Sequence, residues 1–493
     1  MKNVDKLARA LDLVDDDLIE RAAPGAYRKK ENKIPWYKGS WGRWAVAACL
    51  ALCLLTGVLG VMLGKTADPT APTAPGLIGN GGEYGEIADK LQLVKGDDIN
   101  EFNRLFPSDS PSQPDSPSEG GSEGGATDGD NGDHMFATGS DSTVVTVLNG
   151  ARQDVAGGWS DGAIEPDTVG RTDTHLFFLT GGSLLVYTVN GEQSEPVGEY
   201  SRSFGAEAFF LSADGSRLTL ISTGPSQVNV CVLNVADPAN MTVISSFSAV
   251  GRYYAARLVN GKLLLLMGNS VIGEPDYTDE STFVPQYDAG NGLQPLPAAN
   301  IHYPEKLTST NYTVVYQLNE QTLTPEDSVG LLSYSGDIYV AGNEIFVTRP
   351  YVDRSETAAR AMLEIARVSY ADGALRYAGA ASVEGVLKDR ACIDAHNGTL
   401  RIVTNTRELV SEQPMTYRIK AALFCVDIAG MQVVSRLTDF APEGKAVQAI
   451  RFDQSKVYVS VNETVSATEP AYCFDLAALS EIVRSEVSAM PMI

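Results

Sequence analysis

The chain has 493 residues, which is enough to bury a sizeable core and to form two or three domains. Its formal net charge is −24, and a body this acidic repels phosphate backbones, so nucleic-acid binding is disfavoured. The charge is uneven. Residues 1–44 hold ten Lys and Arg against seven Asp and Glu, so the acidic excess lies beyond them.

Residues 1–43 predict a short helical leader. Its first part carries apolar residues at helical spacing, namely Val4, Leu7, Ala8, Leu11 and Val14. A second short helix, "DLIERAA", ends at Pro24-Gly25. Such a small piece cannot bury a core alone, so we expect either a weakly ordered leader or a docking helix for a cytoplasmic partner.

The segment 44–64, "WAVAACLALCLLTGVLGVMLG", has no charge and has the length needed to cross a bilayer. The basic cluster from Arg28 to Arg43 precedes it, and only Lys65 follows closely. The positive-inside rule therefore predicts a cytoplasmic N-terminus and places the rest of the chain outside. A cleaved signal peptide is disfavoured, because the leader is long and no A-x-A-like site follows. The expected partner of this helix is the lipid bilayer.

Gly60 and Gly64 form a small-xxx-small pattern that could let two such helices approach closely. Glycine is common in membrane helices for other reasons, so a weak homodimer through this face is the less favoured interpretation.

Residues 65–141 predict a spacer outside the membrane. It contains one short amphipathic helix at 83–95, with Tyr84, Ile87, Ala88, Leu91 and Val94 on one face. The Pro/Ser/Gly/Asp-rich stretch 107–133 cannot pack a core and predicts a disordered linker.

Residues 142–493 predict an all-β domain. Short apolar runs alternate with Gly, Asn or Asp turns every eight to twelve residues, as in "VNGK" at 259 and "HNGT" at 396. The runs group into units of about 45–55 residues, the period of propeller blades, with an insertion at 268–310. We therefore predict a β-propeller of about six to seven four-stranded blades. Residues 354–368, "RSETAARAMLEIARV", are helical in composition but lie between strands.

Several stretches resemble a family of exported, membrane-anchored β-propeller domains of Gram-positive (clostridial-type) bacteria, distantly related to WD40 propellers. They include "EPDTVGRTDTHLFFLTGGSLLVY" from 165, "GRYYAARLVNGKLLLL" from 251 and "FVPQYDAGNGLQPLPAANIHYPE" from 283. The most specific are "GAASVEGVLKDRACIDAHNGTLRIVTNT" from 379 and "RLTDFAPEGKAVQAIRFDQSKVYV" from 436. The resemblance covers about two thirds of the chain. It implies no reaction and no catalytic residues.

The C-terminus departs from that resemblance. The family continues through at least one further blade after the position of "YCFDLAALSEI" at 472, whereas this chain stops at Ile493. We expect either that the strand "STVVTVLN" at 142–149 closes the ring or that the ring is open and the propeller incomplete.

The sequence predicts no catalytic, cofactor-binding or metal-binding residues. Gly158-Trp159-Ser160-Asp161-Gly162 matches a nucleophile elbow but lacks the strand and helix which that motif needs. His134, His175, His302 and His396 have no metal or base spacing. Cys231, Cys392, Cys425 and Cys473 lie far apart. Cys425 and Cys473 each stand two residues before an Asp and are expected to be small buried strand residues; a disulfide between neighbouring repeats is the less favoured alternative.

The best candidate binding surface is the insertion, because aromatic side chains offer contact area at low entropy cost. Its residues are Tyr277, Phe283, Tyr287, His302 and Tyr303. The alternative is that they cap a neighbouring blade. The leading hypothesis is a non-catalytic binding or scaffold module for an unknown extracellular protein, peptide or glycan. Alternatives are a transmembrane sensor acting through the leader and a propeller-type hydrolase.

Overall fold

The structure, a computed structural model, describes part of the chain. The described residues are 79–80, 82–94, 96–106, 163–189, 194–201, 204–271, 273–355, 358–438, 440–461, 471–476 and 483–487. All of them belong to one compact unit, Pro72–Ile493. Five predicted features lie outside them: the leader 1–43, the apolar segment 44–64 with Gly60 and Gly64, the linker 107–133, the predicted strand 142–149 and the motif 158–162. No helix among the described residues is long and apolar enough to cross a bilayer.

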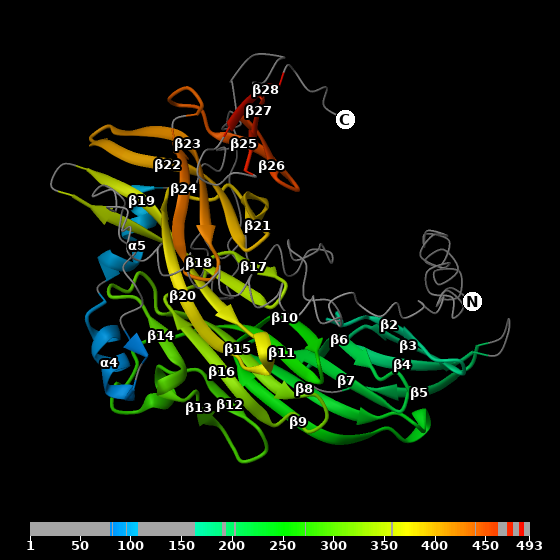
Figure 1. Cartoon of the computed structure of the whole chain (residues 1–493). Coiled ribbons are helices and arrows are strands. Elements are labelled where there is room, and N and C mark those ends of the chain that lie inside the picture. Colours follow the sequence, from blue (N-terminus) through cyan, green and yellow to red (C-terminus); the bar gives the residue numbers. More distant parts are fainter. Residues whose placement is uncertain are drawn as a thin grey trace, which may run out of the picture. The chain divides into compact units, whose positions relative to one another are not determined.

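Strands dominate the described part of the chain, and they form six consecutive antiparallel groups of four (Figure 1). Within each group every strand pairs with the next one of the group in sequence order. We number these groups units 1 to 6. This meander pattern is the expected consequence of short apolar runs joined by tight turns.

Units 1 to 3 occupy residues 169–332. Unit 1 consists of β2 (Val169–Arg171), β3 (His175–Thr180), β4 (Ser183–Thr188) and β5 (Pro196–Tyr200). Unit 2 consists of β6 (Gly205–Leu211), β7 (Arg217–Thr223), β8 (Gln227–Asn234) and β9 (Thr242–Val250). Unit 3 consists of β10 (Arg252–Val259), β11 (Lys262–Ser270), β15 (Asn311–Asn319) and β16 (Pro325–Leu332).

Units 4 to 6 follow without a long interruption. Unit 4 consists of β17 (Ile338–Ala341), β18 (Glu344–Arg354), β19 (Ala359–Ser369) and β20 (Arg376–Glu384). Unit 5 consists of β21 (Ile393–His396), β22 (Thr399–Glu412), β23 (Met415–Asp427) and β24 (Gln432–Thr438). Unit 6 consists of β25 (Val447–Asp453), β26 (Lys456–Val461), β27 (Ala471–Asp475) and β28 (Val483–Val487).

An insertion separates β11 from β15 in unit 3. It contains β12 (Gln286–Asp288), β13 (Gln294–Pro295) and β14 (Ile301–Tyr303). β12 pairs with β9, the last strand of unit 2, and β14 runs parallel to β16, the last strand of unit 3. The insertion therefore covers the free edges of two neighbouring sheets.

Turns with left-handed backbone conformations shape the hairpins. Asn260 and Gly261 have φ of 51° and 76°, and Asn397 and Gly398 have φ of 49° and 76°. Two consecutive residues with positive φ match the right-handed twist of the flanking strands, which is why Asn-Gly predicts a hairpin.

The core lies between consecutive units. Separate apolar clusters join units 1 and 2, units 2 and 3, units 3 and 4, units 4 and 5, and units 5 and 6. Successive side chains of a strand point to opposite faces, so one strand can serve two interfaces. In β18, for example, Ile345 and Val347 face unit 3, whereas Phe346 faces unit 5.

Residues 359–369 form β19 and are not helical, although their composition favours a helix. The strand pairs with β18 on one side and β20 on the other. Leu363 and Ile365 pack toward unit 5, while Ala366 and Val368 pack toward unit 3. Burial on both faces of a central strand outweighs a weak local propensity.

A segment that precedes the six units, residues 79–106, is docked on them, and we call it the strap. It contains β1 (Gly79–Asn80), α4 (Tyr84–Gln92) and α5 (Gly96–Leu105). β1 pairs with β14, and α4 buries Ile87, Ala88 and Leu91 in the cluster between units 2 and 3. The spacing of these three residues places them on one helix face, as the sequence predicts.

The second half of the strap contacts units 4 and 5. Leu105 and Phe106 are buried against Ala359, Ala361 and Leu409. The Tyr417 hydroxyl donates a hydrogen bond to the Leu105 carbonyl at 2.6 Å. The predicted linker 107–133 therefore starts from a segment that already belongs to the domain.

The chain reaches unit 1 through a lead-in segment, residues 163–168. Ile164 exchanges backbone hydrogen bonds with Leu258 of unit 3 (2.8 and 3.0 Å), and Asp167 does the same with Phe209 of unit 2 (2.7 and 2.8 Å). Glu165 forms an ion pair with the buried Arg257. The lead-in segment thus contacts the first strands of units 3 and 2 before β2 begins.

Candidate functional site

The five aromatic and histidine residues proposed from the sequence do not form one exposed surface. Phe283 and Tyr303 are buried, with 3% and 4% of their surface exposed. Tyr277 and Tyr287 are half-buried and pack against the same cluster, Tyr277 on Phe283 with ring centroids 5.7 Å apart. Tyr287 contacts the rings of Phe247 and Tyr316. These side chains mainly cover the interface between units 2 and 3.

His302 lies apart from the other four. Its ring stacks on Tyr377 of unit 4, with centroids 4.6 Å apart. Burial lowers the pKa of His302 to about 4, so its ring is neutral at neutral pH. On the adjacent position of β14, Tyr303 instead contacts the strap, where its hydroxyl lies 3.5 Å from a Glu86 carboxylate oxygen.

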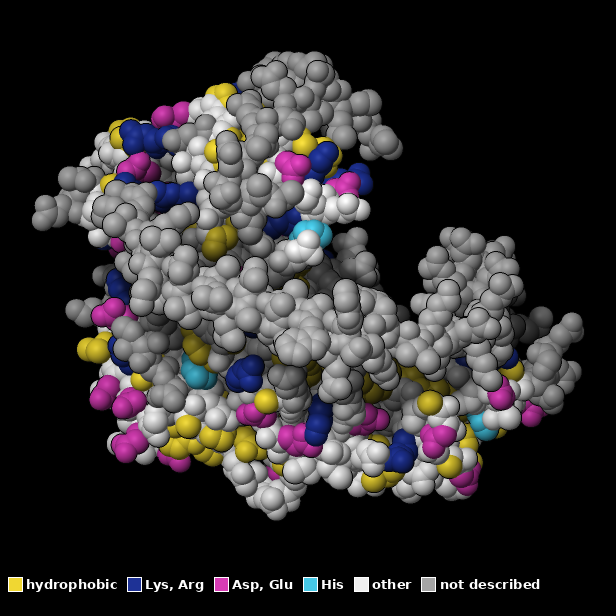
Figure 2. All heavy atoms as spheres, in the orientation of Figure 1, with side chains coloured by type: hydrophobic (Ala, Val, Ile, Leu, Met, Phe, Trp, Pro, Cys, Tyr) yellow, Lys and Arg dark blue, Asp and Glu magenta, His cyan; other side chains and the backbone are white. Residues whose placement is uncertain are grey.

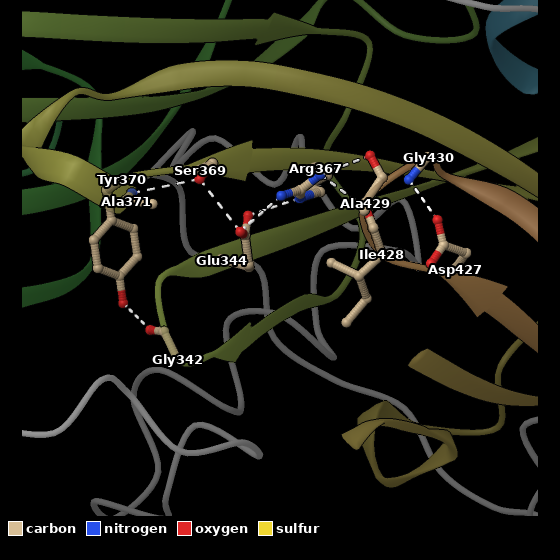
Figure 3. A network of polar contacts seen from close by, with 10 residues as sticks. All are labelled: Gly342, Glu344, Arg367, Ser369, Tyr370, Ala371, Asp427, Ile428, Ala429 and Gly430. Atoms are coloured by element: carbon tan, nitrogen blue, oxygen red, sulfur yellow. Dashed lines mark hydrogen bonds and ion pairs between the residues drawn. The ribbon is translucent and has the colours of Figure 1, made fainter. Parts of the chain in front are cut away.

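Arginines connect neighbouring units through charged networks. In Figure 3, Arg367 of β19 pairs with Glu344 at 2.8 Å and donates to the carbonyls of Ile428 and Ala429 at 2.8 and 3.3 Å. Those carbonyls lie in the β23–β24 turn of unit 5. Arg401 of unit 5 repeats this arrangement, pairing with Asp394 and donating to the Gln454 carbonyl of unit 6. Each network satisfies its own charges and holds two units in register.

A buried ion pair joins unit 4 to the insertion. Arg349 and Glu364 are opposite each other on β18 and β19, and both are buried. Arg349 Nη1 also donates to the Lys306 carbonyl at 3.2 Å and to Thr308 Oγ1 at 3.4 Å. The Arg349 guanidinium lies over the Tyr351 ring, 4.9 Å from its centroid. Nearly all donors of this arginine are therefore committed to structure.

A small hollow of about 170 Å³ lies above that pair, between α5 and β18. Glu101 of α5 lines it and forms ion pairs with Arg354 at 2.6 Å and Lys306 at 3.5 Å. Opposite charges at this site neutralise each other across the strap contact. We therefore assign the hollow to strap docking.

The larger cavity has a volume of about 400 Å³ and lies between units 2 and 3; we call it the unit 2–3 cleft. Three turns supply its polar lining. They are the β6–β7 turn with Ser212, Asp214 and Arg217, the β10–β11 turn with Asn260 and Gly261, and the β15–β16 turn with Glu320 and Gln321. Phe210, Leu258 and Ile164 of the lead-in segment supply an apolar lining.

The charged side chains of the cleft differ in their hydrogen-bond partners. Asp214 accepts hydrogen bonds from Ser212 Oγ at 2.6 Å and from Ser216 N and Oγ at 3.0 and 2.8 Å. These hydrogen bonds lower its pKa to about 2. The positive charge of Arg217 lowers the pKa of Asp214 a little further. The Arg217 and Glu320 side chains form no hydrogen bond or ion pair with another described residue.

The described cysteines and the histidines His175 and His396 have structural surroundings. Cys231, Cys392, Cys425 and Cys473 are buried free thiols, and burial raises the pKa of Cys392 and of Cys425 to about 11. Within the described ranges, no three His, Cys, Asp or Glu side chains gather as a metal site would require. The rings of His175 and His396 lie within hydrogen-bond distance of the neighbouring residues Thr174 and Asn397, and the His175 ring also contacts Phe177, with centroids 6.4 Å apart. His134 lies outside the described residues.

Figure 2 shows acidic side chains gathered over the end of the molecule that carries α4. The exposed residues of this helix include Glu83, at its N-terminal cap, Glu86 and Asp89. Elsewhere on this face basic and acidic side chains are interspersed. The acidic excess of the sequence is thus partly concentrated on the strap.

Six antiparallel four-stranded units with cores between neighbours define an all-β protein of propeller type. The family model described as "Beta propeller domain" matches residues 130–482, more than half of the chain. The chain belongs to this β-propeller domain family.

Several solved structures match the chain at low identity and with low TM-scores. They include dihydro-heme d1 dehydrogenase NirN in complex with DHE (14% identity, TM-score 0.23, covering 69% of this chain and 67% of that chain). The WD40 domain of Toxoplasma gondii coronin is another (10% identity, TM-score 0.28, covering 68% of this chain and 77% of that chain). The uncharacterized protein lmo1340 of Listeria monocytogenes EGD-e is a third (10% identity, TM-score 0.21, covering 68% of this chain and 86% of that chain). No curated protein matches the chain.

Proposed function

We propose that the chain is a single-pass membrane protein that displays a non-catalytic β-propeller binding module outside the membrane. The unit 2–3 cleft carries this proposal, because three turns from two neighbouring units converge there around an apolar lining. The uncharged segment 44–64 and the basic cluster before it support the anchor and its direction.

We further propose that the six units are propeller blades and that residues 142–149 take part in closing the ring. The family match begins at residue 130, so it includes this strand. One face of unit 1 supports the idea. Leu176, Phe178, Leu185 and Tyr187 share a face opposite to the cluster with unit 2, and all four are only half-buried. Apolar residues on that face favour a further packing partner.

Site-specific labelling on intact cells tests the topology. Gln321 is exposed at the cleft, and the four described cysteines are buried. With Cys49 and Cys53 of the proposed membrane segment replaced by Ser, the thiol of Gln321→Cys should react with a membrane-impermeant maleimide and the background should not. Lys30→Cys, in the predicted leader, is the matched control and should react only after the cells are made permeable. Labelling of Lys30→Cys but not Gln321→Cys in intact cells would reverse the proposed orientation.

A further inference from the structure

The unit 2–3 cleft has the dimensions of a ligand site. Its volume of about 400 Å³ lies within the range of roughly 300–1,000 Å³ common for small-molecule pockets. Ile164 is 58% exposed beside it, although its backbone is fixed to Leu258 by two hydrogen bonds. A large apolar side chain held in an open cleft offers contact area without further ordering of the backbone.

An arginine and a glutamate, whose side chains carry opposite formal charges, line the cleft. Arg217 begins β7 of unit 2, and Glu320 follows β15 of unit 3, so they come from different units. A Cβ built on Gly261 would lie 3.8 Å from a Glu320 carboxylate oxygen, which places this carboxylate over the β10–β11 turn. The Glu320 amide donates to the Gly261 carbonyl at 3.2 Å and fixes that turn.

We propose that this cleft binds a zwitterion of amino-acid or short-peptide type. The ligand carboxylate pairs with Arg217, its ammonium group pairs with Glu320, and its apolar side chain lies on Ile164 and Leu258. A guanidinium binds a carboxylate through two parallel hydrogen bonds, which makes this pair the stronger of the two. The inference names a ligand class for the proposed binding function and therefore rests on it.

The negative charge of Asp214 limits which anionic group can bind beside Arg217. Its carboxylate is held by Ser212 and Ser216 and stays ionised beside Arg217. A second fixed negative charge repels dianions such as phosphate more than it repels a single carboxylate. The net charge of −24 acts in the same direction, whereas a zwitterion carries no net charge to be repelled.

Isothermal titration of the full chain in detergent with three dipeptide probes tests the proposal. L-alanyl-L-leucine has both charged ends, its N-acetyl form lacks the ammonium group, and its C-terminal amide lacks the carboxylate. We expect the free dipeptide to bind at least tenfold more tightly than either blocked form, because each blocked end loses a charge-assisted contact.

Two variants test which side chain binds which charged end of the dipeptide. Arg217→Gln should weaken binding of the free dipeptide about tenfold and leave binding of the amide unchanged. Glu320→Gln should weaken binding of the free dipeptide and leave binding of the N-acetyl form unchanged. Arg451→Gln is the matched control, since Arg451 is exposed on β25 of unit 6, and it should bind all three probes as the wild type does.

Equal affinities for the three probes, no detectable binding at millimolar concentration, or an unchanged affinity of Arg217→Gln would each overturn the inference. These measurements use purified protein and do not depend on membrane topology. A chain that labels outside the cell but binds no dipeptide would keep the proposed function and lose only this ligand class.

Discussion

Two segments that precede the six units in sequence pack on them, and different interactions hold each segment in place. The strap, residues 79–106, buries Ile87, Leu91, Leu105 and Phe106 in two apolar clusters. The lead-in segment, residues 163–168, is held by backbone hydrogen bonds and one ion pair, and its Ile164 is 58% exposed.

This difference predicts different strengths of attachment. Burying each large apolar side chain contributes about 1.5–3 kcal/mol, whereas a hydrogen bond contributes about 1 kcal/mol net. The strap should therefore remain on the domain without help from the chain that follows it.

The largest effect is expected beneath α5, at the buried pair Arg349–Glu364. Arg349→Met would leave the Glu364 carboxylate buried without its counter-charge, and we expect a loss of about 3–5 kcal/mol in the free energy of unfolding. Denaturant titration measures it. The double variant Arg349→Met/Glu364→Gln should recover part of that loss, and a double variant that is less stable than Arg349→Met would contradict this account.

The next effect concerns strap docking. Leu91→Ala should destabilise the contact of α4 by about 2–5 kcal/mol, because Leu91 is 2% exposed within the cluster between units 2 and 3. Leu93, two residues later, is 72% exposed, so Leu93→Ala should change the stability by less than about 0.5 kcal/mol. Hydrogen exchange of the α4 amides distinguishes the two. Equal exchange in both variants would mean that α4 is not held by its apolar face.

A pH effect is expected where His302 of β14 stacks on Tyr377 of unit 4. The pKa of His302 is about 4 when folded, below its ordinary value of 6.5. Below pH 6.5 the unfolded chain binds a proton that the folded chain does not, so stability should fall by about 1 kcal/mol per pH unit between pH 6.5 and 4. Carboxylates also titrate at the lower end, so the quantity to measure is the difference between wild type and His302→Gln. A difference independent of pH would contradict the burial of His302.

The smallest effect is expected in the lead-in segment. Glu165 pairs with Arg257, but its side chain is 61% exposed. Glu165→Gln should therefore cost less than about 1 kcal/mol and should become harmless at high salt. A loss comparable to that of Leu91→Ala in thermal unfolding would show that the lead-in segment is as important to the domain as the strap.

Local patterns made much of the all-β architecture predictable. Asn-Gly turns and alternating apolar residues identify hairpins, because both depend on residues that are adjacent in sequence. The strand nature of residues 359–369 was less evident, since contacts with β18 and β20 override their helical composition.

The candidate sites were harder to predict. Tyr303 and Phe283 look like a binding surface in sequence, but α4 lies against Tyr303, and Phe283 is buried in the cluster between units 2 and 3. Such long-range burial leaves no local signal. Arg217 and Glu320 are about one hundred residues apart in ordinary turns. Only the packing of unit 2 on unit 3 brings their turns to one cleft.

Cutting the linker tests most directly whether the strap belongs to the domain. A specific protease site placed within residues 107–133 of the full chain would allow complete cleavage in detergent, followed by size-exclusion chromatography. We expect the N-terminal fragment with residues 79–106 to elute together with the propeller fragment, and Leu91→Asp to allow them to separate. Separation of the two wild-type fragments on cleavage would show that the strap does not hold the domain and would contradict the account.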